Sequence, residues 1–190
     1  IEIYNDDLLQ NKYLGGENAV NLLRASDFPQ RRWYRDLGLD TEDSDQRALF
    51  DYLKAQTNDA VAQEALRLVE YIVRNHRPVT ELLTADYMVA NYYSARAYGA
   101  EHQQAWRRLP EPPFPEYPYD PDDYRPIRIA NADYGEIPHA GVLTSAMFLN
   151  RFPTTETNRN RHRSRMVHAL FLDTDVLQLS GVRPGEAVDL

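Results

Sequence analysis

The stretch NDAVAQEALRLVEYIVRNHRP, residues 58–78, decides the fold class of this chain. Its apolar side chains recur at helical spacing, at positions Val61, Ala65, Leu68, Val69 and Ile72. This period predicts an amphipathic helix with one face in a core. Asn58 or Asp59 can cap the start of the helix, and Pro78 ends it.

Similar patterns on both sides predict further helices. Upstream they cover residues 15–25, 26–38 and 40–56, with Ser26 or Asp27 and then Ser44 as candidate caps. Downstream they cover residues 80–100, 140–150 and 155–173, the first beginning with a turn and ending at Gly99. Residues 125–138 can hold a short strand or β-hairpin. We therefore expect a mainly α protein with a bundle-like helical domain and a smaller helical half, and with room for one short β-hairpin.

A proline-rich segment divides the chain. Residues 110–126 hold seven of the twelve prolines, which excludes a helix or a central strand there. Its aromatic side chains favour an ordered strap on the surface over a free polyproline linker: Phe114, Tyr117, Tyr119 and Tyr124. We expect a helical domain at residues 1–109, the strap at 110–126 and a smaller helical half at 127–190. Residues 124–190 carry a net charge of +1 and the remainder −9, so we expect the two halves to pack together.

Composition excludes several classes of protein. A net charge of −8 over 190 residues argues against a nucleic-acid binder and against docking on anionic lipid. No apolar run reaches the roughly 18 residues that a membrane span needs. The chain has no cysteine, which excludes disulfides, thiolate metal sites and covalently attached c-type haem within it.

The most unusual stretch is TNRNRHRSRMVHALFLDTD, residues 157–175, in which arginines precede an apolar run. On a helix, Arg159 and Arg163 fall on the apolar face and His162 lies at its edge, whereas Arg161 and Arg165 fall on the opposite, solvated face. Cations in a first helical turn oppose the helix dipole, so Arg159 and Arg163 need a partner. We expect Arg163 to be buried and paired, and Arg159 less so. The partner is either a carboxylate of the acidic half or a bound anion such as a substrate carboxylate, a phosphate or a haem propionate.

Other chemistry has little support in the residues. The acidic run at residues 40–45 lacks the glycine and the distal glutamate of a calcium loop, and a solvated helix start explains it better. The five histidines have no metal-ligand spacing, and hydrolase and phosphate-loop signatures are absent. The sequence therefore shows no catalytic signature and leaves enzymatic activity undecided.

Two stretches carry a family resemblance. RPVTELLTADYMVANYYSARAYG, residues 77–99, resembles the closing segment of a bacterial domain of unknown function found in planctomycete-type cytochrome C-associated proteins. HAGVLTSAMFLNRFPTTETNRNRHRSRMVHALFLDTDVL, residues 139–177, resembles the domain that follows it. LGGENAVNLLRASDFPQRRWY, residues 14–34, is similar to the proteobacterial branch.

The resemblance implies a periplasmic or extracellular protein of the cell envelope. In such proteins a Cys-x-x-Cys-His haem segment commonly follows the second domain, so we expect no cofactor in this chain and a haem domain downstream or in a partner. The resemblance also implies a link to polysaccharide breakdown and supplies no catalytic residues.

We therefore expect a structural and interaction module that docks a cytochrome c domain, with polysaccharide as a further candidate partner. The alternatives are an oxidoreductase or carbohydrate-active enzyme with a site between the halves, and a carbohydrate- or anion-binding module.

Overall fold

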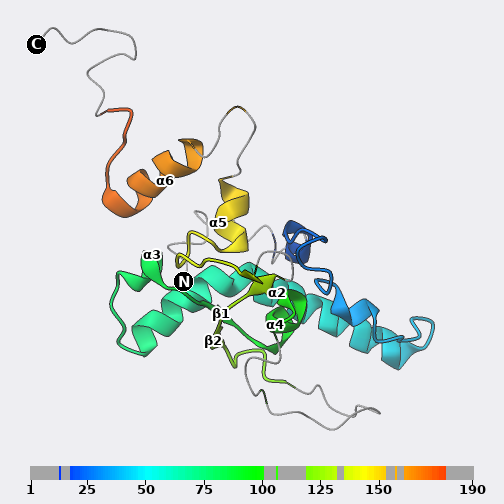
Figure 1. Cartoon of the computed structure of the whole chain (residues 1–190). Coiled ribbons are helices and arrows are strands. Elements are labelled where there is room, and N and C mark those ends of the chain that lie inside the picture. The colour runs from blue at the N-terminus through cyan, green and yellow to red at the C-terminus, as the bar shows by residue number, and fades with distance from the viewer. Residues whose placement is uncertain are drawn as a thin grey trace, which may run out of the picture. The chain divides into compact units, whose positions relative to one another are not determined.

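The computed structural model is mainly helical, as expected, and describes residues 13, 18–100, 106, 119–131, 135–152, 157 and 161–178 (Figure 1). The α-helices are α2 (Ser44–Arg74), α3 (Glu81–Thr84), α4 (Tyr92–Tyr98), α5 (Ala146–Arg151) and α6 (Arg161–Leu172). Two 3₁₀ turns, η2 (Ala19–Leu22) and η3 (Trp33–Arg35), precede them. The strands are β1 (Met88–Ala90), β2 (Arg125–Ile127), β3 (Ala130–Asn131) and β4 (Gly135–Glu136). None of the helices described is long and apolar enough to cross a bilayer.

The chain forms two compact units, one ending at Arg151 and the other beginning at Phe152. The first contains all the described elements up to α5, and the second contains α6. The expected division into residues 1–109, 110–126 and 127–190, with the halves packed together, stays a prediction.

Helix α2 is a single 31-residue helix, where two helices were expected. It begins at Ser44, and the carboxylate of Asp43 caps it by accepting from the backbone N–H groups of Asp45 and Gln46 at 3.1 and 3.0 Å. Asn58 therefore lies inside the helix and caps nothing. Its amide side chain instead donates to the Tyr13 carbonyl at 2.9 Å and accepts from the Ala19 N–H. The side chain of Asn58, which resembled a helix N-cap in the sequence, thus makes tertiary contacts instead.

Helix α2 ends in a Schellman-type turn. His76 adopts a left-handed conformation (φ 50°), and the N–H of Arg77 donates to the carbonyl of Ile72 at 3.0 Å. The N–H of His76 donates to the Val73 carbonyl at 3.2 Å. This turn satisfies the last carbonyls of α2 before Pro78 and fixes the backbone of Arg77.

The segment after α3 contains a strand that the sequence pattern did not indicate. Strand β1 pairs antiparallel with β2, with Met88 opposite Ile127 and Ala90 opposite Arg125. Asn91 then starts α4 through a capping box with Ser94, and Gly99 ends α4 in a left-handed conformation, as expected.

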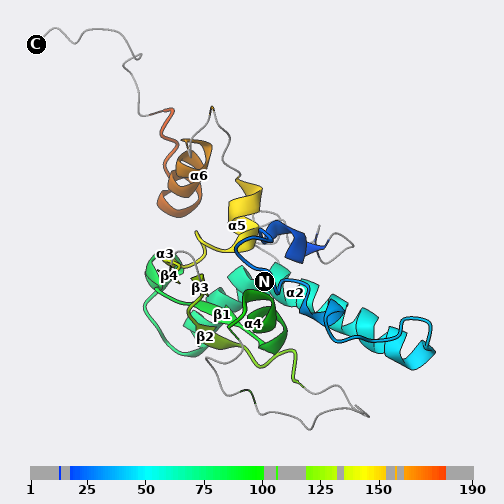
Figure 2. The same cartoon turned by 45° about the vertical axis from the view of Figure 1, so that its right-hand side comes forward.

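The core of the first unit lies along α2, which contacts β1, α4, α5 and η2 (Figures 1 and 2). Its buried residues include Val61, Ala65, Leu68 and Ile72, which are four of the five positions that the helical period predicted. Against them pack Val89, Tyr93, Met147 and Phe148, all fully buried.

The end of the proline-rich segment, residues 119–126, packs on α2 and α4 of the same unit. Tyr119 stacks on Tyr92 with ring centroids 3.4 Å apart, and its carbonyl accepts from the Tyr93 hydroxyl at 3.0 Å. The guanidinium of Arg67 lies over the Tyr124 ring at 4.7 Å and pairs with Asp122 at 2.8 Å. Phe114 and Tyr117 lie outside the described residues.

The expected hairpin is formed by β3 and β4, with Ala130 opposite Glu136. After it, Gly141 and Val142 dock on α3: the Gly141 N–H donates to Ala85 at 3.0 Å and the Val142 N–H to Leu82 at 2.8 Å. Gly141 has a φ of 53°, and a Cβ at this position would collide with the Leu82 carbonyl. Only glycine fits this contact.

Candidate functional site

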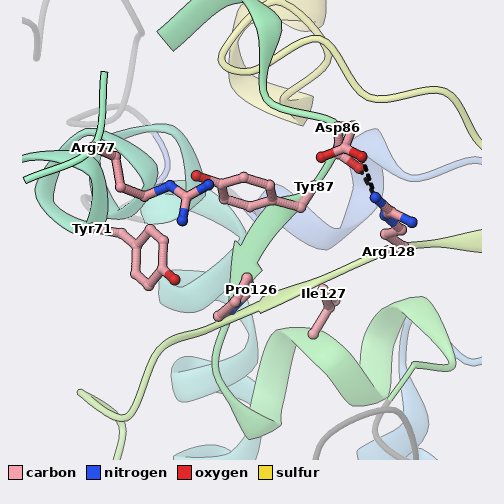
Figure 3. Close-up of a pocket in the computed structure, with 7 residues that line it drawn as sticks. All are labelled: Tyr71, Arg77, Asp86, Tyr87, Pro126, Ile127 and Arg128. Atoms are coloured by element: carbon pink, nitrogen blue, oxygen red, sulfur yellow. Dashed lines mark hydrogen bonds and ion pairs between the residues drawn. The ribbon is translucent and has the colours of Figure 1, made fainter. Parts of the chain in front are cut away.

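An open cleft of about 410 Å³ lies where β1 begins and β2 ends (Figure 3). Its lining residues come from the end of α2 and the turn after it, from the approach to β1, and from β2 with the residue that follows: Tyr71, Arg77, Asp86, Tyr87, Pro126, Ile127 and Arg128. Figure 3 shows the two tyrosines and Arg77 toward one end and Asp86 with Arg128 toward the other. The cleft thus combines aromatic rings with charged groups of both signs.

At the first end, Glu81 joins a guanidinium to a phenol. Arg77 Nε donates to Glu81 Oε2 at 2.6 Å, and the Tyr87 hydroxyl donates to the same oxygen at 2.5 Å. The guanidinium of Arg77 lies 5.4 Å from the centroid of the Tyr87 ring, which meets the Tyr71 ring edge-on at 5.9 Å. These contacts hold Tyr87 and Arg77 in one orientation.

The same contacts shift the pKa values of these three groups further from pH 7. The hydrogen bond with Glu81 raises the pKa of Arg77, and the hydrogen bond from Arg77, followed by that from Tyr87, lowers the pKa of Glu81. Burial, together with the hydrogen bond to Glu81, raises the pKa of Tyr87 to about 12. All three groups therefore keep one charge state around pH 7.

At the second end, Arg128 is joined to Asp86. Its Nη2 contacts the Asp86 carboxylate, and its Nε donates to the Asp86 carbonyl at 3.2 Å. Both side chains face solvent, with exposed fractions of 54% for Arg128 and 71% for Asp86. The cleft therefore opens to water at this end.

A second cluster of ionisable groups is buried in the core. Glu64 of α2 is only 3% exposed and accepts hydrogen bonds from the Tyr98 hydroxyl and from the N–H of Ala146, the first residue of α5. Burial raises the pKa of Glu64 to about 7, although both hydrogen bonds lower it. Because the cluster has no exposed face, it links α2, α4 and α5 and does not present a group to a ligand.

The residues predicted to pair with an anion lie in or near α6. His162 is exposed, and its ring meets the Phe152 ring edge-on at 5.8 Å. Arg163 is half-buried, and its Nε donates to the Phe152 carbonyl at 2.9 Å. Arg159 lies outside the described residues. The pairing of Arg159, Arg163 and His162 with a carboxylate or another anion stays a prediction.

The expected solvated face of α6 carries Arg161 and Arg165, and the side chain of Arg165 is 41% exposed. Arg161 is exposed, and Arg165 forms a two-pronged pair with Asp175 at 2.8 and 3.0 Å. Asp175 also accepts from the N–H of Leu177 at 3.1 Å. The pair draws the chain after α6 back onto the helix, which helical spacing could not reveal because Asp175 lies beyond the end of the helix.

Sequence reasoning did not find the cleft. Tyr87 lines the cleft, whereas Tyr92 and Tyr93 pack with the core. The one sequence signal for the cleft was the spacing of four residues between Arg77 and Glu81, which suits an ion pair in a helical turn.

Metal binding has no support in the described part of the chain, where no group of three or more histidine, aspartate or glutamate side chains can hold a metal ion. The acidic run at residues 40–45 is a capped, exposed helix start, as expected.

Comparison with known proteins finds one family. Residues 24–100 match the model of a family described as PSD4, protein of unknown function (DUF1592). The match contains residues 77–99, on which the first resemblance rests, and it runs from the turns before α2 to the residue after Gly99. No curated protein and no solved structure matches the chain significantly.

Proposed function

We propose that this chain is a structural and interaction module of an extracytoplasmic, c-type-cytochrome-associated protein. In this proposal the second unit docks a cytochrome c domain or partner through α6 and the turn that follows it. The partner and the periplasmic or extracellular location come from the family resemblance. The docking surface comes from the apolar side of α6, which the second unit does not bury by itself.

The observation that carries the proposal is that the second unit by itself does not bury the apolar side of α6. No residue of this helix is buried, although it contains Met166, Val167, Leu170 and Phe171. Leu170, on this side of the helix, is 39% exposed, and Leu177, in the turn after the helix, is 62% exposed. Covering such side chains yields roughly 25 cal/mol per Å² of apolar area, which favours association with a complementary surface.

Charges surround this apolar surface. Arg161 and His162 are exposed at the start of α6, and the Arg165–Asp175 pair holds the turn that carries Leu177. An apolar centre with a polar rim is the usual anatomy of a protein interface, and the cations of the rim can steer an acidic partner. In this proposal Arg159, Arg163 and His162 contact carboxylates of the partner, a haem propionate among them.

The haem belongs to the partner or to a downstream segment. Covalent attachment of c-type haem needs cysteine thiols, and this chain contains no cysteine. The resemblance also implies a link to polysaccharide breakdown, so polysaccharide is a candidate substrate of the whole assembly. This link assigns no reaction step to this chain.

The cleft of the first unit supports a binding site better than it supports the alternative of an enzyme active site. A general acid or base works best with a pKa near the operating pH, whereas ion pairing raises the pKa of Arg77 and lowers that of Glu81. Asp86 and Arg128 are likewise joined to each other. The geometry of the cleft therefore favours binding over proton transfer.

The experiment is a calorimetric titration of this chain with the c-type cytochrome domain encoded in the same reading frame or by a neighbouring gene. We expect the double variant Leu170→Ser/Leu177→Ser to bind at least about tenfold more weakly, because interface leucines are lost from the apolar centre. Val73→Ser is the control, since Val73 is also apolar and exposed but lies in the first unit.

The proposal is wrong if no such cytochrome is encoded there. It is also wrong if the cytochrome fails to bind, or if the double variant and the control bind it equally well.

A further inference from the structure

We propose that the cleft lined by Tyr71, Arg77, Tyr87 and Arg128 binds a neutral saccharide. The cleft lies in the first unit, so this inference does not depend on the docking role proposed for α6 in the second unit.

The backbone builds the cleft before any ligand arrives. The pairing of Met88 with Ile127 in the antiparallel β1–β2 ladder places Tyr87 beside Arg128, one position further along. The Schellman-type turn after α2 fixes Arg77, and the packing of α2 on β1 brings Tyr71 against Tyr87. A preformed site loses little conformational entropy on binding, which favours weakly interacting ligands such as sugars.

The aromatic rings provide the apolar part of the site. Tyr71 and Tyr87 are half-buried, and their rings stand nearly perpendicular, at 74°. The face of an aromatic ring is apolar and carries partial negative charge, so it packs well on the C–H groups along one face of a pyranose ring. Pro126 of β2, which is half-buried, extends this surface (Figure 3).

The charged groups provide paired donors and acceptors. A guanidinium has five N–H donors and a carboxylate has two acceptor oxygens, so each ion pair at the rim presents both kinds of group side by side. Arg128 and Asp86 are more than half exposed and can reach vicinal hydroxyls, each of which donates and accepts. Arg77 contacts Glu81 through Nε–H, one of its five donors.

The balance of charge selects against ions. Two guanidiniums face two carboxylates, Glu81 and Asp86, so the groups at the cleft sum to no net charge. An anion would have to displace a carboxylate that already holds its arginine, and a cation would have to displace an arginine. A neutral ligand that is rich in hydroxyl groups gains hydrogen bonds at both pairs without breaking either.

The test is isothermal calorimetry of the whole chain with neutral tetrasaccharides: cellotetraose, xylotetraose, mannotetraose and maltotetraose. Tetragalacturonate and inorganic phosphate serve as the anionic probes. We expect at least one neutral sugar to bind with a dissociation constant below about 1 mM. Its affinity should change less than about twofold between 0.05 and 0.5 M NaCl, because screening does not act on a neutral ligand.

Two variants locate the binding. Tyr71→Ala removes an aromatic wall and Arg77→Ala removes a donor and the clamp on Tyr87, so each should weaken the affinity about tenfold. Arg74→Ala is the matched control, since Arg74 also pairs with a glutamate four residues away, Glu70 at 2.7 Å, and does not line the cleft. Circular dichroism of each variant checks that it is folded.

Three results would overturn the inference. The first is that no neutral sugar binds. The second is that a neutral sugar binds equally well to the wild type and to both folded cleft variants. The third is that tetragalacturonate or phosphate binds more tightly than every neutral sugar and loses affinity with salt, which would make the cleft an anion site.

Discussion

Glu64 is expected to make the stability of the first unit fall as the pH rises toward neutrality. Burial raises the pKa of Glu64 from 4.5 to about 7 in the folded protein. Between these values the folded state holds a proton that the unfolded chain has released, so the free energy of unfolding decreases with increasing pH. The contribution is fully present below about pH 4.5 and is lost as the pH rises through about 7.

The magnitude follows from the same two pKa values. One pKa unit corresponds to about 1.4 kcal/mol, so the full contribution of Glu64 is about 3 kcal/mol. This is a large part of the 5–15 kcal/mol by which a typical domain is stable.

The perturbation is Glu64→Gln, which keeps the shape of the side chain and removes its titration. At pH 4.5 folded Glu64 is a carboxylic acid, whose hydroxyl oxygen can still accept a hydrogen bond, whereas the amide nitrogen of the variant cannot. One of the two donors, the Tyr98 hydroxyl or the Ala146 N–H, therefore loses its acceptor, and the variant should lose about 1–3 kcal/mol at pH 4.5. At pH 8 the wild type carries a buried charge that the variant lacks. The stability difference between the two proteins should therefore shift by about 3 kcal/mol toward the variant.

Urea unfolding at pH 4.5, 6 and 8, followed by circular dichroism, measures this shift directly. Tyr98→Phe provides a second readout, because the hydroxyl of Tyr98 lowers the pKa of Glu64 and its removal should extend the pH dependence upward. Parallel stability curves for the wild type and Glu64→Gln between pH 4.5 and 8 would refute the reasoning, since Glu64 would then titrate alike in the folded and unfolded states.

Three further predictions concern backbone conformation and haem. Gly141→Ala should lower the free energy of unfolding in urea by about 3 kcal/mol or more, because the new Cβ meets the Leu82 carbonyl. Gly38→Ala, with a similar positive φ and open space around it, should lower it by only about 1–2 kcal/mol, and equal losses would contradict the close contact. His76→Gly should raise the melting temperature by about 1–4 °C by relieving a left-handed conformation, and a lowered value would contradict that conformation. The purified chain should show no Soret band after incubation with haem, and a stable band lost in His162→Ala would make the chain a haem protein itself.

Local patterns in the sequence determined that the chain is mainly helical, part of the buried face of α2, the end of α4 and the hairpin. The helices expected at residues 15–25 and 26–38 were wrong, because in the described residues these stretches form only the 3₁₀ turns η2 and η3. The apolar period of α2 identified four residues of the buried face, Gly99 marked the end of α4, and residues 125–138 contain the hairpin. Each of these features depends on residues that are only a few positions apart. A short stretch of sequence is therefore enough to predict it.

Tertiary partners decided the rest. Residues 58 and 59 lie inside α2 because the amide of Asn58 bonds to Tyr13 and Ala19, far away in the sequence. Strand β1 exists because β2, nearly forty residues later, pairs with it, and three residues alone carry no strand period. The cleft appears only when this pairing brings Tyr87 beside Arg128, and Glu64 becomes a buried acid only when Tyr98 and Ala146 close over it. In each case a polar or short segment takes its structure from a hydrogen-bonding partner that is distant along the chain, and no local pattern encodes that partner.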